Sequence, residues 1–182
     1  RRVLGGVDLE VADGQFLCVL GPSGCGKTTL LQLIAGLETP DSGEVLVKGR
    51  KVTGTGGTTG MVFQEYALFP WLTVSGNVQF GPSVRGVSRN ERKARARHYI
   101  DLVGLAGFEK SYPCELSGGM RQRAAIARAL ANEPDLLLMD EPLAALDSQL
   151  RESLQQEVLR IWRETGKTVI YVTHSISEAV FL

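Results

Sequence analysis

The chain has few cysteines, no excess charge of either sign and no long apolar run. It contains 3 cysteines, and its 20 basic side chains are balanced by 20 acidic ones. The cysteines are scattered, which excludes a disulfide framework and a zinc site, and the balanced charge gives no overall field that would attract nucleic acid or anionic lipid. No stretch could span a bilayer, and no signal peptide is recognisable. We therefore expect a protein of the reducing cytoplasm.

Length and composition are typical of one globular domain. A length of 182 residues is enough to bury a substantial core, and the hydrophobic content of 43% is ordinary for such proteins. The sequence starts almost directly at an expected strand and stops at Leu182, inside an apolar helical pattern without a C-cap. We expect a single domain over residues 1–182 that is truncated at both ends.

Short β-rich runs alternate with helical patterns along most of the chain. Capping-box patterns place helix starts near residues 89 and 176, and a 3.6-residue apolar period indicates a helix over about 148–164. Alternating strands and helices favour a largely parallel sheet that is covered on both faces. Residues from about 66 to 131 are mostly helical and are interpreted as an inserted helical subdomain. The expected strands are Val7–Val11, Phe16–Leu20, Val45–Val47, Met61–Phe63, Leu136–Met139 and Val169–Val172.

The most informative motif is a phosphate-binding loop between an apolar strand and an expected helix over Thr28–Leu37. Its glycines let successive N–H groups point inward at phosphate oxygens. The lysine supplies a charge for the β- and γ-phosphates, and the first threonine hydroxyl is placed for Mg²⁺. The helix N-terminus favours an anion at the same place. We therefore predict binding of a nucleoside triphosphate by Gly21, Pro22, Ser23, Gly24, Cys25, Gly26, Lys27, Thr28 and Thr29.

Two carboxylates, Asp140 and Glu141, end the apolar run that starts at Leu136. A phosphate-binding loop alone leaves kinase, GTPase, helicase and transporter motor open. A buried strand aims its last residues at the carboxyl edge of the sheet, where ligands bind in such folds. We predict that Asp140 holds Mg²⁺ through water and that Glu141 polarises or deprotonates the attacking water.

A third motif reads Leu-Ser-Gly-Gly-Met-Arg-Gln-Arg over residues 116–123. Ser117, with the N–H groups of Gly118 and Gly119, caps a helix that runs through Ala131, and its exposed N-terminus is a second anion site. The motif resembles the signature of ATP-binding cassette (ABC) ATPases. That resemblance implies an α/β fold: a P-loop NTPase core with a largely parallel sheet, an antiparallel β subdomain and an inserted helical subdomain.

The resemblance also implies how the two anion sites are used. Two copies would pair head to tail as a homodimer, and Ser117, Gly118 and Gly119 of each would close on the ATP of the other. Three further residues take roles by the same resemblance. Gln64 matches the Q-loop glutamine that reaches Mg²⁺ and water, Asp147 matches the D-loop aspartate that communicates across the dimer, and His174 matches the switch histidine that contacts the γ-phosphate.

Three segments resemble the ATPase subunits of bacterial nitrate, sulfonate and taurine importers: Met61–Val74, Glu133–Pro142 and Ile161–Lys167. That resemblance implies an ATP-hydrolysing motor at the inner face of the cell membrane. Its partners would be transmembrane permease subunits and, indirectly, an extracytoplasmic solute-binding protein. Residues 65–74 would then lie beside the groove that receives the permease, although Phe69, Trp71 and Leu72 fit a core role equally well.

Two alternatives to a transport motor remain. One is a non-transport ABC ATPase that acts on nucleic acid or the ribosome; the basic cluster over residues 89–97 is interpreted instead as a solvated helix face, and we expect no nucleic-acid partner. The other is a nucleotide switch without turnover, which Glu141 and His174 argue against. Copurification with permease subunits or with nucleic acid separates the first alternative from the motor.

Some positions depart from the usual pattern of the family. Ser175 follows His174 where aspartate is common, and both can cap a helix. Cys114 and Glu115 precede the signature where the importers often carry His-Gln. The aromatic residue that stacks on adenine in this family lies upstream of Val7, outside the chain, so weaker ATP binding is expected of these residues alone. The Gly- and Thr-rich residues 53–60 lack a lysine and a following helix, and are interpreted as a plain connector.

Overall fold

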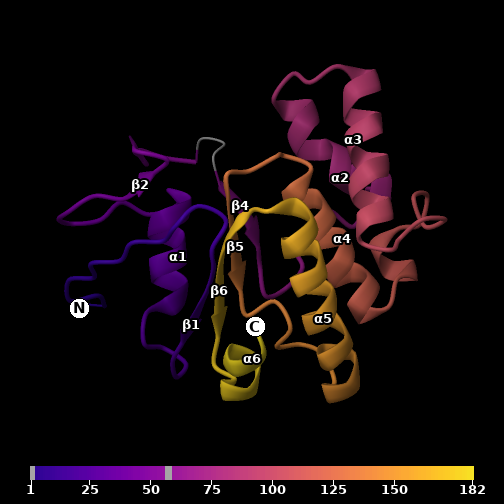
Figure 1. Ribbon diagram of the computed structural model, residues 1–182. Helices are drawn as coiled ribbons and strands as arrows, with labels where there is room; N and C mark the ends of the chain where they lie inside the picture. The colour runs from indigo at the N-terminus through magenta and orange to yellow at the C-terminus, as the bar shows by residue number, and fades with distance from the viewer. Residues whose placement is uncertain (1–2, 56–58) are drawn as a thin grey trace.

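A four-stranded parallel sheet forms the centre of the structure, a computed structural model that describes residues 3–55 and 59–182 (Figure 1). The neighbour order is β1-β6-β5-β4, so the first and last strands of the sheet lie side by side. The sequence predicts each of these strands to within two residues at either end. They are β1 (Phe16–Leu20), β4 (Thr59–Val62), β5 (Leu136–Asp140) and β6 (Thr168–Thr173).

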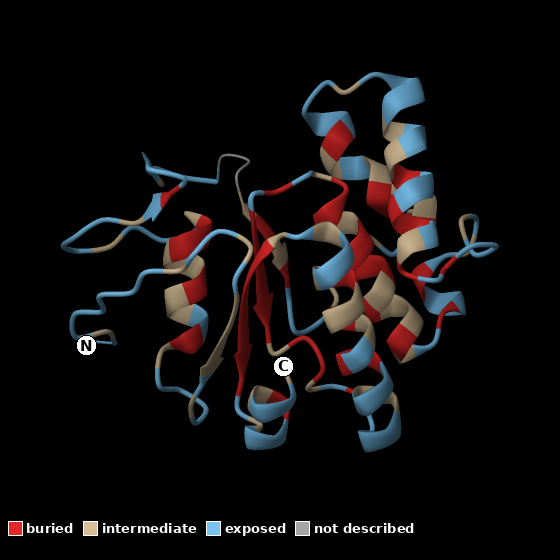
Figure 2. Cartoon of the chain, in the orientation of Figure 1, coloured by how far each residue is buried: buried red, intermediate tan, exposed pale blue. Residues whose placement is uncertain are grey.

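Helices cover both faces of this sheet, as the alternation of elements predicts. On one face lies α1 (Lys27–Ala35), and on the other lie α4 (Gly118–Leu130) and α5 (Ser148–Thr165) (Figure 1). Alternate side chains of β5 divide between them: Leu136 and Leu138 join the core beneath α1, whereas Leu137 and Met139 join the core beneath α4 and α5. The two central strands are therefore buried on both sides, which Figure 2 shows as red arrows.

The second sheet is a small antiparallel hairpin of β2 (Leu46–Val47) and β3 (Arg50–Lys51). It lies beside α1 at the edge of the molecule that carries the N-terminal segment (Figure 1). The α/β class with a parallel and an antiparallel sheet is confirmed. The expected connector over residues 53–60 lies partly outside the described residues.

The described stretch between β4 and β5 holds helices and no strand. Its elements are α2 (Val74–Val84), α3 (Arg89–Leu102), a 3₁₀ turn at Pro113–Glu115 and α4. The hydroxyl of Ser88 accepts the N–H of Glu91 at 3.3 Å, which confirms the predicted helix start near residue 89. The other predicted start, near residue 176, is confirmed by α6 (Ile176–Phe181).

One expected strand does not form. Val7–Val11 runs extended beside α1 and the hairpin, but it pairs with no strand among the described residues. Its apolar side chains stay half exposed, at 51% for Val7 and 45% for Leu9. An apolar run becomes a strand only where a neighbour pairs with its N–H and C=O groups, and β2 pairs with β3 instead. Among the described residues, no helix is long and apolar enough to cross a membrane.

Asn77 organises the turn that leads into α2. It is fully buried, and its side-chain amide accepts the N–H of Phe69 at 2.8 Å and donates to the carbonyl oxygens of Phe69, Leu72 and Thr73 at 3.0–3.1 Å. One side chain therefore satisfies four backbone groups of a loop that has no ladder of its own.

Replacing Asn77 by alanine should lower the free energy of unfolding by about 2–3 kcal/mol, because several buried backbone groups lose their partner. The change is measured by urea denaturation as a shift of the unfolding midpoint at an unchanged m-value. Asn90→Ala, on the exposed face of α3, is the matched control and should shift stability by less than about 0.5 kcal/mol. Equal effects of the two substitutions would contradict this role of Asn77.

Candidate functional site

The predicted site residues gather where the parallel strands end. The phosphate-binding loop follows β1, Gln64 follows β4, Asp140 ends β5 and His174 follows β6. Since all four strands run the same way, their carboxyl ends share one edge of the sheet, which is the lower edge in Figure 1. Residues far apart in the sequence thus meet in the crevice where ligands bind in such folds.

The phosphate-binding loop has the backbone that its glycines predict. Gly24 and Gly26 adopt positive φ angles of 79° and 101°, which side-chain-bearing residues rarely adopt. A Cβ atom at Gly26 would also lie 2.9 Å from Cδ2 of Leu4. The loop wraps around the Lys27 side chain, whose Nζ donates to the carbonyl oxygens of Gly21 and Pro22 at 2.8 and 3.0 Å. The lysine charge is therefore held at the N-terminus of helix α1.

The two carboxylates at the end of β5, Asp140 and Glu141, both contact the phosphate-binding motif. Asp140 Oδ1 accepts the hydroxyl of Thr28 at 3.2 Å, and Glu141 Oε1 lies 3.4 Å from Lys27 Nζ. Burial raises the pKa of Asp140 above its usual value, while the Thr28 hydrogen bond acts in the opposite direction. A cation placed beside a buried carboxylate of this kind would stabilise its charged form.

Glu141 is the point where the contacts converge. Its φ angle of 43° lies in the left-handed region, unusual for a residue with a side chain, and its N–H is held by Val172 O at 3.0 Å. Its second carboxylate oxygen, Oε2, lies 2.7 Å from Nδ1 of the exposed His174. A single carboxylate thus contacts both Lys27 at the start of α1 and His174 just after β6. Strained backbone at such a position is typical of a functional residue.

The other predicted residues are not joined to this cluster. No hydrogen bond among the described residues links the side chain of Gln64, which is exposed, to the rest of the site. Ser117 is exposed and caps α4 by accepting the N–H of Met120 at 3.3 Å, and Asp147 caps α5 by accepting the N–H of Leu150 at 2.9 Å. The signature glycines, Gly118 and Gly119, face side chains of α5 and its preceding loop. The structure therefore separates one assembled cluster from a second group that stands apart.

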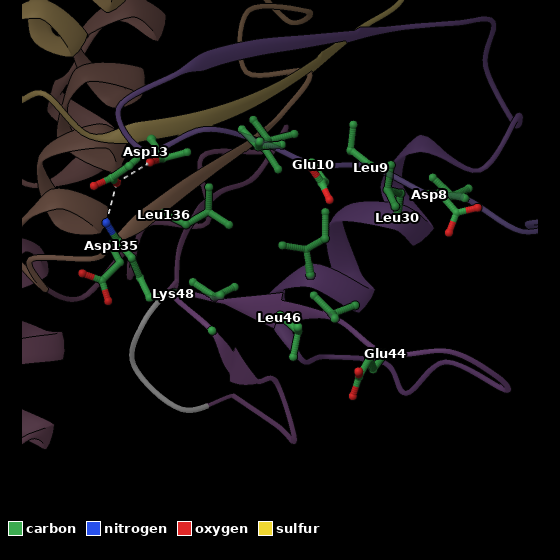
Figure 3. A pocket seen from close by; sticks show the side chains of 18 residues that line it. Asp8, Leu9, Glu10, Asp13, Leu30, Glu44, Leu46, Lys48, Asp135 and Leu136 are labelled. Carbon is green, nitrogen blue, oxygen red and sulfur yellow. Dashed lines mark hydrogen bonds and ion pairs between the residues drawn. The ribbon is translucent and has the colours of Figure 1, made fainter.

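The cavity drawn in Figure 3 lies away from this site. Its volume is about 920 Å³, and it is lined by the extended N-terminal segment, α1, the β2–β3 hairpin and the starts of β5 and β6. None of the predicted site residues lines it. At one end Lys48 pairs with Asp13 and lowers the pKa of that carboxyl.

The sequence analysis missed Arg151 and Glu178, which lie directly behind Glu141 and His174. Glu178 fits the capping-box pattern, in which its side chain would turn back to accept the N–H of the N-cap residue Ser175. In the structure that carboxylate turns inward and accepts the hydroxyl of Thr173 at 2.7 Å. An acidic residue and an arginine in otherwise amphipathic helices give no sequence signal that separates them from surface charges.

A phosphate-binding loop between a strand and a helix, in contact with carboxylates at the end of another, buried strand of the same sheet, defines a P-loop nucleoside triphosphatase. The chain belongs to the ABC transporter family, because the family model of that description matches residues 4–144. The resemblance of the signature motif is thereby confirmed, and membership of this family makes the chain an ATP-binding protein and an ATPase.

Curated relatives match the whole chain. It is 56% identical over 181 residues to an uncharacterized ABC transporter ATP-binding protein of Methanocaldococcus jannaschii, an alignment that covers all of this chain and 68% of that protein. It is 51% identical to the taurine import ATP-binding protein of Roseobacter denitrificans, with the same coverage. It is also 51% identical to the nitrate import ATP-binding protein of a Synechocystis strain, over 98% of this chain and 67% of that protein.

Solved structures agree with the fold. The chain superposes with a TM-score of 0.82 and 38% identity on an ATP-binding cassette described as a dimer in a post-hydrolysis state with ADP and Pi; the match covers 98% of this chain and 83% of that one. A dimeric bacterial ABC transporter cassette gives a TM-score of 0.83 at the same identity and coverage. None of these relatives and structures is described as acting on nucleic acid, so the comparisons do not support that alternative.

Proposed function

We propose that the chain is the ATP-hydrolysing subunit of an importer that takes up a small anion, such as nitrate, taurine or another sulfonate, through a separate permease. The observation that carries the catalytic part is the contact of Glu141 with both Lys27 and His174. The taurine and nitrate import proteins named above, each about half identical to this chain, support the transported class. The nucleotide-binding domain would span residues 1–182, with its helical subdomain at about 66–131.

The loop of residues 21–29 would hold the triphosphate. Its N–H groups and the N-terminus of α1 present positive partial charge to phosphate oxygens. Lys27 donates to carbonyl oxygens of its own loop and lies 3.4 Å from Glu141, so its ammonium group is already at the place where phosphate charge would arrive. Thr29 and the remaining residues of the loop complete the proposed cradle.

The residues beside this loop fit a magnesium ion. Mg²⁺ prefers oxygen donors, and it is usually held by one or two protein oxygens together with water and substrate phosphates. The Thr28 hydroxyl and the Asp140 carboxylate supply such oxygens 3.2 Å apart, and Gln64 would join them from the end of β4. When bound, the ion would supply positive charge that offsets the negative charge developing on the phosphates.

Glu141 is the proposed general base for hydrolysis. It would take the proton of a water whose oxygen bonds to the γ-phosphorus, while the bond to the bridging oxygen breaks and yields ADP and inorganic phosphate. His174 would orient Glu141, since its Nδ1–H can donate to the carboxylate at 2.7 Å, and it would also reach the γ-phosphate.

The signature residues and Asp147 would act across a head-to-tail homodimer. Ser117 exposes the N-terminus of α4, which is an anion site that is not joined to the cluster of its own chain in the described residues. Ser117, Gly118 and Gly119 would complete the ATP site of the other copy, with Asp147 beside them. The dimeric state of both structural neighbours supports this arrangement.

An exposed aromatic surface after β4 is the proposed permease contact. Trp71 is 70% exposed, so it is not the core residue that the sequence left open. Its ring centroid lies 5.5 Å from that of Phe69, and Arg128 stacks on Phe69 while donating to the carbonyl oxygens of Tyr66 and Ala67. An exposed aromatic on a firmly held loop is typical of an interaction surface.

Trp71→Ala should therefore weaken the permease complex by at least about tenfold in Kd, since a central aromatic anchor contributes about 2 kcal/mol or more to an interface. The ATPase activity of the isolated chain should stay unchanged. Affinity is measured with the reconstituted permease. Val84→Ala, at the other end of α2, removes an equally exposed apolar side chain at 73% and should have no effect. Full permease binding by Trp71→Ala would contradict the assignment.

Uptake by the complete transport system tests the proposed function as a whole. Labelled nitrate, taurine and an alkanesulfonate are offered in turn, with the solute-binding protein and permease present. Accumulation of at least one of them that depends on ATP hydrolysis is expected, together with localisation at the cytoplasmic face of the membrane. ATP turnover without uptake, combined with copurification of nucleic acid or ribosomes, would overturn the importer.

A further inference from the structure

Glu178 is a buried carboxylate directly behind the histidine loop. Glu178 is 4% exposed, and its Oε2 accepts hydrogen bonds from the hydroxyl of Thr173 at 2.7 Å and from that of Tyr171 at 3.2 Å. The Thr173 hydroxyl oxygen in turn accepts the N–H of Ser175 at 3.0 Å. The residues on both sides of His174 are therefore tied to one carboxylate, although no hydrogen bond among the described residues joins His174 itself to it.

Arg151 connects this carboxylate to the loop before α5. Its Nη2 donates to the carbonyl oxygen of Leu146 at 2.8 Å, immediately before Asp147. Its Nε lies 3.7 Å from Oε1 of Glu178, which is a charge contact just beyond hydrogen-bond distance. The arginine thus contacts two segments that are distant in the sequence: the loop that ends at Asp147 and the segment that carries His174.

The pair shares a small space with the proposed catalytic residues. Glu141, His174, Arg151 and Glu178 all line one narrow cavity, together with Ala144, Thr173 and Ser175. Burial, with the neighbouring Glu178, raises the pKa of Tyr171, so this phenol remains an O–H donor to the carboxylate. Glu178 is the buried member of the pair, with 5% of its side chain exposed against 33% for Arg151. Loss of the arginine would therefore leave a buried carboxylate without its countercharge and allow its surroundings to shift.

We propose that Arg151 and Glu178 are positioning residues that fix the histidine loop against the segment before Asp147, and thereby hold the His174 ring against Glu141 during hydrolysis. The inference rests on the ATP hydrolysis of the proposed function. Neither residue belongs to the proposed nucleotide-binding set, so their effect would reach the reaction through His174. A displacement of about 1 Å at a catalytic group is enough to slow a reaction by up to about a hundredfold.

Steady-state ATPase kinetics of Glu178→Gln test the proposal in the complete protein. The amide keeps the shape of the carboxylate but removes its charge, so kcat should fall at least about tenfold while KM for ATP changes less than about threefold. In a His174→Ala background, where there is no ring left to position, the same substitution should change kcat less than about twofold. A merely structural role would produce the same factor in both backgrounds.

Matched controls separate this effect from a loss of charge or of stability. Glu152→Gln makes the same substitution at an exposed position beside Arg151 and should leave kcat unchanged. If Glu178→Gln fails to fold, as judged by circular dichroism, Arg151→Met is compared in the same two backgrounds instead. In that variant Glu178 keeps its hydrogen bonds from Thr173 and Tyr171. Arg163→Met, on the exposed end of α5, is its control.

The outcomes also separate this inference from the proposed function. Normal kcat in Glu178→Gln and Arg151→Met, or equal losses with and without His174, would overturn the positioning role and leave the importer intact. An unmodified protein that hydrolyses no ATP would instead contradict the proposed function. A kcat loss that disappears in the His174→Ala background supports the positioning role.

Discussion

Replacing Glu141 by glutamine should lower kcat for ATP hydrolysis about a thousandfold, because the amide cannot take the proton of the attacking water. ATP affinity should change little, since glutamine keeps the shape of the side chain beside Lys27 and His174. Without turnover, ATP should accumulate at the interface and hold two copies together. Phosphate release measures the rate, fluorescent-nucleotide titration the affinity, and size-exclusion chromatography with ATP the dimer.

Glu133→Gln is the control for this experiment. Glu133 is an exposed carboxylate that pairs with Arg95 at 2.8 Å, away from the phosphate-binding loop, and its loss should leave turnover within about twofold. Near-normal turnover in Glu141→Gln would rule out the proposed general base. A loss of nucleotide affinity equal to the loss in rate would assign Glu141 to binding instead.

Mixing two inactive variants should restore ATP hydrolysis. Lys27→Met removes the charge of the phosphate-binding loop, and Ser117→Arg blocks the N-terminus of α4 with a long side chain. In a head-to-tail dimer each site takes Lys27 from one copy and Ser117 from the other, so a mixed dimer has one site with both residues intact. An equal mixture should therefore recover about a quarter of normal activity, as half of its dimers are mixed and each has one of two sites.

Two controls make the mixing experiment decisive. Each variant alone should stay below about 1% of normal activity, as loss of one group that stabilises charge in the transition state costs about two to three orders of magnitude. Ser88→Arg removes the N-cap of α3 in the same way as Ser117→Arg removes that of α4, and it should remain active. No recovery in the mixture, with both variants folded and able to dimerise, would contradict a shared site.

The strand ends were predictable because local composition and fold geometry agree there. The runs that end at Asp140 and Thr173 are buried on both faces, whereas the run that ends at Leu20 is half-buried. In a parallel sheet the residues that follow all three runs lie at its carboxyl edge. The edge location of Lys27, Asp140 and His174 follows from that geometry.

The contacts within the site could not be read from the sequence. Glu141 meets His174 only because its backbone adopts a left-handed turn, which no local propensity of glutamate favours. Glu178 has the spacing of a capping residue, and its inward contact depends on hydroxyl groups of β6. The failed strand over Val7–Val11 has the same cause, because pairing depends on a neighbour that the apolar pattern does not specify.

The sheet order also has a consequence for the time at which activity can appear. Among the described residues β1 pairs with β6 alone, so the strand that precedes the phosphate-binding loop gains its neighbour only after residues up to Thr173 have been synthesised. Such non-local parallel pairing forms slowly. During synthesis, residues 21–29 would leave the ribosome long before Glu141 and His174 could reach them. We expect a nascent chain that stops short of β6 to hydrolyse no ATP, so that consumption of ATP begins only once the domain has closed.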